Sequence, residues 1–276
     1  MSGTGSPPAL VLLHGFAGRP EVWAPLLPLL PKDCRVFAPA ILGHSPAILP
    51  GVGNDSTADS QRGFEGFETE VDRLAGEIRK HGLEGAHVAG YSLGGRLALG
   101  LLVRHGRLFS GATLLGTHPG LTSESERRQR LAADEVWARR LENDDLDAFF
   151  DTWEAQPIFS TQSPAQREKQ RALRRGLDAH GLARAMRRLG LGCMPDYSRS
   201  LGDLRLPVSW VAGELDEKFR SLAAVCAAAT PSGITKTIEG AGHNVVLERP
   251  EDVASILSSN LTQTPIPLNA LEGLSI

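Results

Sequence analysis

The sequence predicts an α/β fold, in which a mostly parallel central sheet is flanked by helices and a helical cap is inserted. Short apolar runs such as residues 9–13 and 208–212 are typical of parallel strands that are covered on both faces. Helical segments separate these runs, and this alternation favours a parallel sheet with right-handed crossovers. Residues 121–201 break the alternation, because they hold no convincing strand and are dense in Arg, Glu, Ala and Leu.

Six runs are expected to form strands, and five helical segments are expected to surround them. The expected strands are residues 9–13, 35–39, 85–89, 112–115, 208–212 and 234–238. The expected helices outside 121–201 are residues 21–30, 64–81, 97–103, 218–228 and 250–257. Pro31 closes the first helix, and Pro250 suits the first turn of the last one, where its missing amide hydrogen is not needed.

The length of 276 residues allows a large core and fits one domain with an insertion better than two domains. We expect residues 1–120 and 202–261 to form the core and residues 121–201 to form three to five cap helices above the strand ends. Residues 46–63 are rich in Pro, Gly, Asn, Asp and Ser and are expected to form an exposed loop. Residues 262–276 are expected to form a loosely attached tail.

A strand–turn–helix segment carries the spacing of a nucleophile elbow, Gly-x-Ser-x-Gly. Gly90 and Gly94 lie two residues before and two after Ser92. Ser92 is expected to adopt a strained backbone conformation, because the chain passes too close to both flanking positions for a Cβ. Its hydroxyl would then lie at a helix N-terminus, where backbone amides favour negative charge.

A serine hydroxyl becomes a nucleophile or a base only when a neighbour takes its proton. In this fold the acid and the histidine are expected at later strand ends, in that order. The strand at 208–212 is followed by Glu214 and Asp216, and the last strand is followed by His243. We expect His243 to contact Ser92 and Asp216 to orient His243. Glu214 is the alternative acid.

Two further features belong to the same strand ends. An oxyanion hole needs two converging amides, and we expect them to come from Leu93, which follows the nucleophile, and from Phe16 in the first loop. Three more histidines at strand ends are expected to shape the pocket rather than carry the proton. These are His14, His44 and His118.

The composition excludes several other classes of protein. A net charge of −3 gives no general attraction to nucleic acid or to an anionic membrane. Residues 1–14 have the pattern of neither a signal peptide nor a membrane span. The three cysteines, Cys34, Cys193 and Cys226, have no metal-ligand spacing, so we expect reduced thiols in a cytoplasmic protein and no metal site.

These residues resemble the α/β-hydrolase superfamily over nearly the whole chain. Several segments are more similar to one member family, the 2-succinyl-6-hydroxy-2,4-cyclohexadiene-1-carboxylate (SHCHC) synthases of menaquinone biosynthesis. The segments are residues 90–96, 118–121, 127–130, 153–159, 172–174, 213–219 and 242–244. The matches within 121–201 are specific, because caps vary almost freely in this superfamily.

The resemblance implies a cofactor-free carbon–oxygen lyase that eliminates pyruvate from a succinyl-cyclohexene polycarboxylate. In that family the Ser–His–Asp geometry abstracts a proton next to the succinyl ketone, with the serine as base or as relay to the histidine, and no acyl-enzyme forms. The oxyanion hole then stabilises an enolate, which the same two amides can do.

Arginines supply planar donors that hold carboxylates in a fixed orientation. Arg96 lies one turn into the helix after the elbow, so we expect it to face the pocket. The resemblance implies that Arg130 and Arg174 also bind carboxylates. The composition of the surrounding segment alone would equally fit arginines on a solvated helix face. The pocket aromatics of the family match Tyr91, Trp153 and Phe159.

Two other functions remain open at the level of sequence. A serine hydrolase, such as a carboxylesterase or a carbon–carbon hydrolase, would use the same three residues covalently, but inward arginines disfavour neutral esters. A binding module without activity would not need an intact serine, aspartate and histidine. The expected partner is a small polycarboxylate, with no nucleic acid and no membrane insertion, and the chain is expected to be a monomer or a small homo-oligomer.

Overall fold

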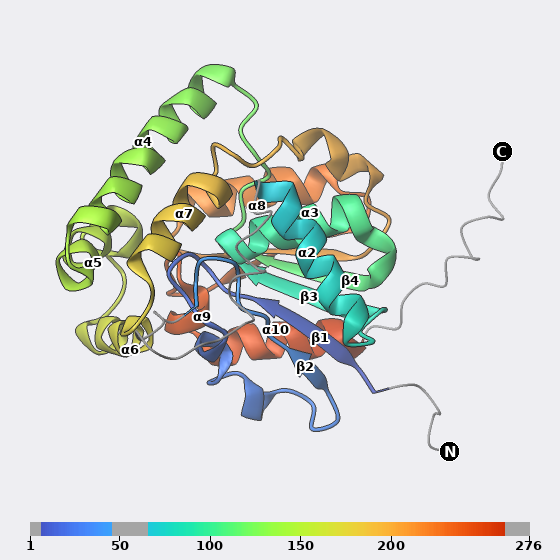
Figure 1. Cartoon of the computed structure of the whole chain (residues 1–276). Coiled ribbons are helices and arrows are strands. Elements are labelled where there is room, and N and C mark those ends of the chain that lie inside the picture. Colours follow the sequence, from blue (N-terminus) through green and yellow to red (C-terminus); the bar gives the residue numbers. More distant parts are fainter. Residues whose placement is uncertain (1–6, 46–65, 263–276) are drawn as a thin grey trace, which may run out of the picture.

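The computed structural model describes residues 7–45 and 66–262. It contains one sheet of parallel strands in the order β2-β1-β3-β4-β5-β6. The strands are β1 (Ala9–Leu13), β2 (Arg35–Phe37), β3 (Ala86–Tyr91), β4 (Phe109–Leu115), β5 (Val208–Gly213) and β6 (Gly233–Ile238). This confirms the predicted α/β fold with a parallel central sheet (Figure 1).

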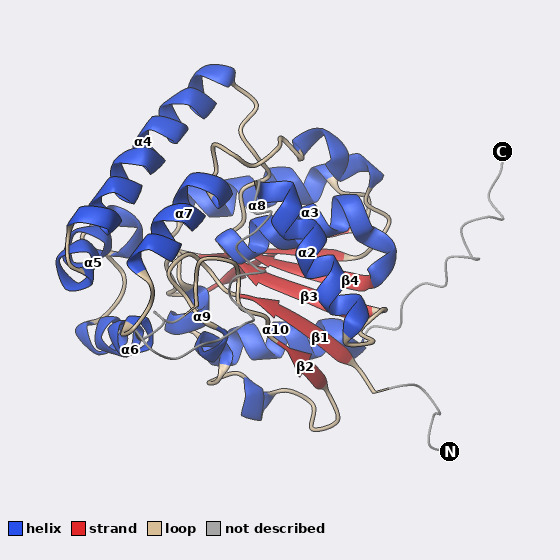
Figure 2. Cartoon of the chain, viewed as in Figure 1, coloured by secondary structure: helices blue, strands red, loops and turns tan. Residues whose placement is uncertain are grey.

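Helices cover both faces of the sheet, as Figure 2 shows. The flanking helices are α2 (Phe67–Lys80), α3 (Leu93–His105), α8 (Glu217–Ala229), α9 (Val245–Glu248) and α10 (Pro250–Thr262). Side chains in β1 alternate between the two faces, as the two-residue period of a strand requires. Val11 and Leu13 join the core cluster beneath α2 and α3, whereas Leu10 and Leu12 join the cluster that includes residues of α10.

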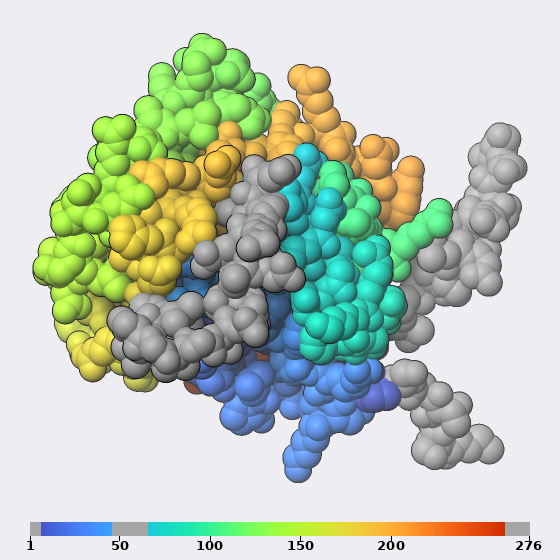
Figure 3. Space-filling view, viewed as in Figure 1, coloured from blue at the N-terminus to red at the C-terminus, as the bar shows by residue number. Residues whose placement is uncertain are grey.

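Four helices lie between β4 and β5, and we call them the cap helices. They are α4 (Glu124–Asn143), α5 (Leu146–Glu154), α6 (Pro164–Arg174) and α7 (Ala179–Leu189). In Figure 3 they form the green to gold surface beside the blue and cyan surface of the core. A separate apolar cluster that includes Phe149, Leu182 and Met186 joins α4, α5 and α7. The boundaries of the cap at residues 121 and 201 stay a prediction.

The expected helix over residues 21–30 is wrong. Two short 3-10 helices, Pro20–Trp23 and Leu27–Leu29, occupy this segment instead. Pro25 and Pro28 explain the difference, because proline within a helix removes an amide hydrogen and clashes with the preceding turn. The expected loop at 46–63 lies outside the described residues, and so does the expected tail beyond residue 262.

The strand register places the candidate site residues at one edge of the sheet. Leu13 of β1 pairs with Gly90, and Tyr91 of β3 pairs with Leu115. The carboxyl ends of neighbouring strands therefore lie side by side, where ligands bind in open α/β sheets. No helix in the described part of the chain is long and apolar enough to cross a membrane.

A buried histidine in the sheet makes stability depend on pH. His87 of β3 contacts the hydroxyl of Thr113 at 2.8 Å, and the amide of Asn260 in α10 donates to the same hydroxyl and to Ser209. Burial lowers the pKa of His87 to about 4. At pH values between about 4 and the ordinary pKa of about 6.5, His87 is protonated in the unfolded chain but not in the folded chain.

We expect the free energy of unfolding to fall as the pH falls from about 6.5 towards 4. In His87→Gln, the slope of this free energy against pH near pH 5 should decrease by about 1.4 kcal/mol per pH unit, since one fewer proton is taken up on unfolding. Urea unfolding at a series of pH values measures both slopes. Identical slopes in the two proteins would contradict the assignment.

Candidate active site

Ser92 occupies the junction of β3 and α3. Its backbone has φ 52° and ψ −107°, the strained conformation that the spacing predicts. A Cβ at Gly90 would overlap the carbonyl of Gly94, and a Cβ at Gly94 would overlap the carbonyl of Leu13. The glycines are therefore required by the backbone packing, and this packing projects Ser92 from the sheet edge.

His243 lies between Ser92 and Asp216. Its Nε2 is 3.2 Å from the Ser92 hydroxyl oxygen, and its Nδ1 is 2.7 Å from Oδ2 of Asp216. With Nδ1–H donating to the carboxylate, Nε2 is free to accept the serine proton. The imidazole is 4% exposed, and the ring of Phe219 packs against it at 4.5 Å between centroids.

The structure distinguishes the two candidate acids. Asp216 follows β5, and its Oδ1 accepts from the amide of Phe219, so it also caps α8. Glu214 lies two residues earlier and accepts from the amide of Gly240 instead. Asp216 is therefore the carboxylate that is brought to His243, and Glu214 braces the turn after β6.

The first loop, residues 14–18, lies beside the elbow. Phe16 and Leu93 both line the cavity next to Ser92. Within the described residues, neither of their amides donates to a backbone carbonyl, and Leu93 is the first residue of α3, where no acceptor exists inside the helix. Both amides thus remain candidates for an oxyanion hole. Ala17 adopts φ 53°, which is unusual for a residue other than glycine.

Two of the three histidines that were expected to shape the pocket lie behind it. His14 accepts from the amide of Ile41 through Nε2, and burial lowers its pKa to about 4. The ring of His44 packs edge-on against Phe16 at 5.5 Å. His14, within the first loop, and His44, which packs against it, do not line the cavity, so the expectation holds directly only for His118.

A cavity of about 180 Å³ lies between the strand ends and the cap helices. Every predicted site residue lines it except Asp216, which lies behind His243. The lining site residues are Phe16, Tyr91, Ser92, Leu93, Arg96, Arg130, Trp153, Phe159, Arg174 and His243. The cavity wall is therefore formed by residues that are more than 150 positions apart in the sequence.

The three cavity arginines differ in how their charge is balanced. Arg130 pairs with Asp134 at 2.8 Å, and Arg174 pairs with Glu154 at 2.6 Å. Arg96 donates to the carbonyl of Leu189 at 2.8 Å and has no ion pair among the described residues. Burial, together with the nearby charge of Arg130, lowers its pKa to about 9. Arg96 is therefore a charged group that an anionic ligand would stabilise.

Sequence reasoning did not assign a role to three other polar side chains at the site. Gln156 and Gln170 line the cavity, and Oε1 of Gln170 is buried without a hydrogen-bond partner in the described structure. Gln170 lies one helical turn before Arg174 in α6, so the i, i+4 spacing could have identified it. For Glu154 the only signal in the sequence was its position next to Trp153. No group of three potential metal ligands is found among the described residues.

Comparison with known proteins identifies the family of this chain. A family model described as the alpha/beta hydrolase family matches residues 10–256. The 2-succinyl-6-hydroxy-2,4-cyclohexadiene-1-carboxylate synthase of Salmonella typhimurium is 31% identical over 261 residues, which cover 95% of this chain and 96% of the relative. The protein of the same name from Escherichia coli is 31% identical over 254 residues, with 92% and 94% covered. The chain is an α/β hydrolase of the SHCHC synthase family.

Solved structures share the fold of this α/β hydrolase. MenH from S. aureus matches with a TM-score of 0.83 and 24% identity, covering 94% of this chain and 95% of that chain. A thermophilic esterase from Thermogutta terrifontis matches with a TM-score of 0.73 and 24% identity, covering 94% and 90%. The enol-lactonase from Burkholderia xenovorans has the same TM-score at 19% identity, covering 95% and 94%.

His118 of this α/β hydrolase lies in the cavity wall as a neutral hydrogen-bond donor. Its Nδ1 accepts from the amide of Gly120 at 3.1 Å, so the neutral ring carries its proton on Nε2. Burial lowers the pKa of His118 to about 4, and the nearby cations of Lys218, Arg96 and Arg130 act in the same direction.

We expect His118 to remain neutral from about pH 8 down to pH 5, as the Nε2–H tautomer. Imidazole ¹⁵N shifts in the protein, assigned with a His118→Gln variant, report both the tautomer and the pKa. An imidazole at this position that titrates near the ordinary value of about 6.5 would show that the cations and the burial do not act on it as described.

Proposed function

We propose that this enzyme is a carbon–oxygen lyase that eliminates pyruvate from a succinyl-cyclohexene polycarboxylate, the SHCHC synthase reaction of menaquinone biosynthesis. One observation carries the proposal: the Ser–His–Asp geometry opens into a cavity whose wall contains three arginines, one of which has no carboxylate partner among the described residues. The two relatives at 31% identity carry the name of this activity. We place the enzyme in the cytoplasm, as a monomer or a small homo-oligomer.

The proposed chemistry begins with a proton transfer. Ser92, in contact with Nε2 of His243, acts as the base or as the relay through which the proton next to the succinyl ketone reaches the imidazole. The electron pair of the broken C–H bond forms an enolate, and Asp216 stabilises the resulting imidazolium. The ketone then re-forms, the electron pair of the enolate moves into a new ring C=C bond, and the ring C–O bond breaks. Pyruvate leaves as its enolate, which takes up the proton held by His243 and thereby restores the base.

The cavity wall suits both the charge and the transition state of this reaction. The amides of Phe16 and Leu93 would donate to the enolate oxygen, where negative charge develops. Arg96, Arg130 and Arg174 would bind the carboxylates of the substrate, which must lose their hydration on entering a buried site. No covalent intermediate is needed, since the serine oxygen exchanges only a proton.

A serine hydrolase is the second candidate. The same contact of 3.2 Å between Ser92 and His243 would activate the hydroxyl for attack on an ester or ketone, and esterases share the fold. The cavity argues against neutral esters, because such substrates would bring no counter-charge to the partly buried Arg96.

Pyruvate release from the pathway intermediate distinguishes the two functions. We expect wild type to release pyruvate and Ser92→Ala to lose at least about a thousandfold in kcat, because the proton acceptor is lost. Labelling by a fluorophosphonate and turnover of p-nitrophenyl acetate are expected to be weak. Strong labelling and rapid ester turnover, without pyruvate release, would support the hydrolase.

Asp216→Asn separates catalysis from stability at one position. Asparagine also caps helices well, so the melting temperature should stay close to that of wild type. The imidazole would lose its carboxylate partner and adopt the wrong tautomer, which lowers kcat by about 10⁴-fold in enzymes with this geometry. Steady-state kinetics and thermal unfolding test the two halves. Wild-type kcat in this variant would exclude Asp216 as the carboxylate that orients His243.

A further inference from the structure

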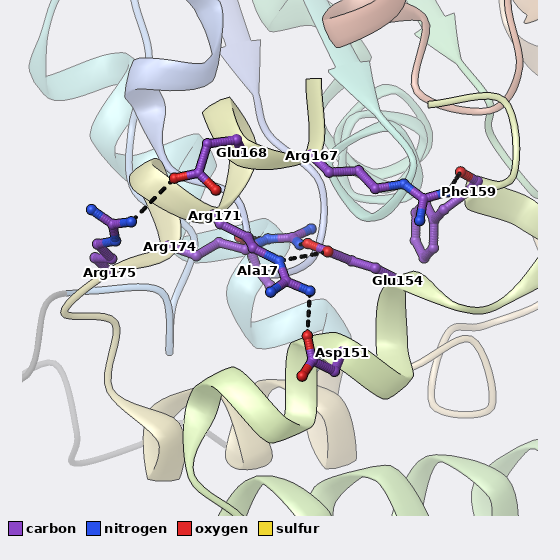
Figure 4. Close-up of polar contacts among 9 residues, drawn as sticks. All are labelled: Ala17, Asp151, Glu154, Phe159, Arg167, Glu168, Arg171, Arg174 and Arg175. Atoms are coloured by element: carbon purple, nitrogen blue, oxygen red, sulfur yellow. Dashed lines mark hydrogen bonds and ion pairs between the residues drawn. The ribbon is translucent and has the colours of Figure 1, made fainter. Parts of the chain in front are cut away.

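The carboxylate of Glu154, the last residue of α5, accepts from two arginines of α6. Its Oε1 is 2.6 Å from Nη1 of Arg174, and its Oε2 is 2.8 Å from Nε of Arg171. Figure 4 shows the three side chains meeting between the helices. Both oxygens of one buried carboxylate, 3% exposed, are therefore used by guanidinium groups from the same neighbouring helix.

Arg174 connects this ion pair to the first loop. Its Nε donates to the carbonyl of Ala17 at 3.3 Å, and its guanidinium lies 4.6 Å above the ring of Phe150. Ala17 follows Phe16 and has the left-handed backbone conformation, which persists in proteins only when the surroundings hold it. The bond from Arg174 is one of those constraints, and it acts on the loop that carries the Phe16 amide.

These contacts decide how much of Arg174 is available to a ligand. Nε and Nη1 each already donate to the protein, while Nη2 has no protein acceptor among the described residues. Arg174 also lines the cavity. It can therefore offer Nη2 and the second hydrogen of Nη1 to a substrate carboxylate, in an orientation that Glu154 determines.

We propose that Glu154 is a positioning residue: it holds the Arg174 guanidinium in the cavity wall and, through the bond from Arg174 to Ala17, keeps the Phe16 amide in place. The inference rests on the proposed function, since it assigns Arg174 to the substrate carboxylate and Phe16 to the enolate oxygen. A buried cation needs a partner of this kind, because an unpaired charge in the protein interior is costly.

Asp151 provides a matched control on the same helix. It lies one turn before Glu154, pairs with Arg171 at 2.6 Å, and its side chain is 67% exposed. Asp151→Asn therefore removes an ion pair between α5 and α6 without changing any contact of Arg174. A loss that depends only on the docking of the two helices would appear in this variant as well.

The test compares Glu154→Gln with Asp151→Asn in pyruvate release. For Glu154→Gln we expect kcat to fall about 10- to 100-fold, because small displacements of a binding group have effects of this size. Asp151→Asn should stay within about twofold of wild type. Equal losses in the two variants would overturn the proposal.

A double-mutant cycle tests whether Glu154 acts through Arg174. When Arg174→Gln is already present, adding Glu154→Gln should change kcat by less than about twofold, since the group that Glu154 positions is gone. Independent, multiplicative losses would show that Glu154 acts by another route and would overturn the proposal. If Glu154→Gln does not fold, Glu154→Asp keeps the charge but shortens the side chain, and we expect a smaller loss of kcat. Wild-type kinetics in Glu154→Asp would then count against the proposal.

A binding measurement separates this inference from the proposed reaction. Tricarballylate is the probe, and tryptophan fluorescence is the readout, because Trp153 lines the cavity. If wild type releases no pyruvate but binds tricarballylate, the proposed function fails, and Glu154→Gln should still raise the Kd about tenfold while Asp151→Asn leaves it unchanged. An equal Kd in all three proteins, or no binding to wild type, overturns the positioning role.

Discussion

The chain crosses itself so closely at the elbow that a Cβ at Gly90 or Gly94 would overlap a backbone carbonyl. This contact between β3, α3 and the end of β1 holds Ser92 in its left-handed conformation, which a serine does not adopt without support. The position of the hydroxyl thus follows from backbone packing rather than from its own hydrogen bonds. His243 and the first loop can be placed accurately because this point of reference is rigid.

Charge in the cavity is the second constraint, and the cap helices provide two of the three arginines that line it. Two of the three arginines, Arg130 and Arg174, pair with carboxylates from the cap, Asp134 and Glu154, so the protein tolerates the burial of Arg174 before a ligand arrives. Arg96 comes from the core and relies on a backbone carbonyl. An anionic ligand would therefore supply a counter-charge to Arg96, which has no ion pair among the described residues.

The same fold is found in proteins named as MenH, an esterase and an enol-lactonase. A serine hydroxyl next to an imidazole can exchange a proton with a substrate or attack it, so the contact between Ser92 and His243 is compatible with both reactions. Which of the two reactions occurs must therefore depend on the residues above this contact. In this chain these are the arginines and aromatic side chains that line the cavity, and three of them, Arg130, Trp153 and Arg174, belong to the cap helices.

Local patterns in the sequence determined the strands and the elbow, because burial on both faces requires continuous apolar runs and the tight turn at Ser92 requires glycine at set spacings. They also indicated which strand ends carry the acid and the histidine. Choosing Asp216 over Glu214, placing His14 and His44 away from the cavity wall, and pairing Glu154 with Arg174 needed the tertiary structure. Those outcomes depend on how segments distant in the chain pack together, and side chains two residues apart can face different partners once a loop folds.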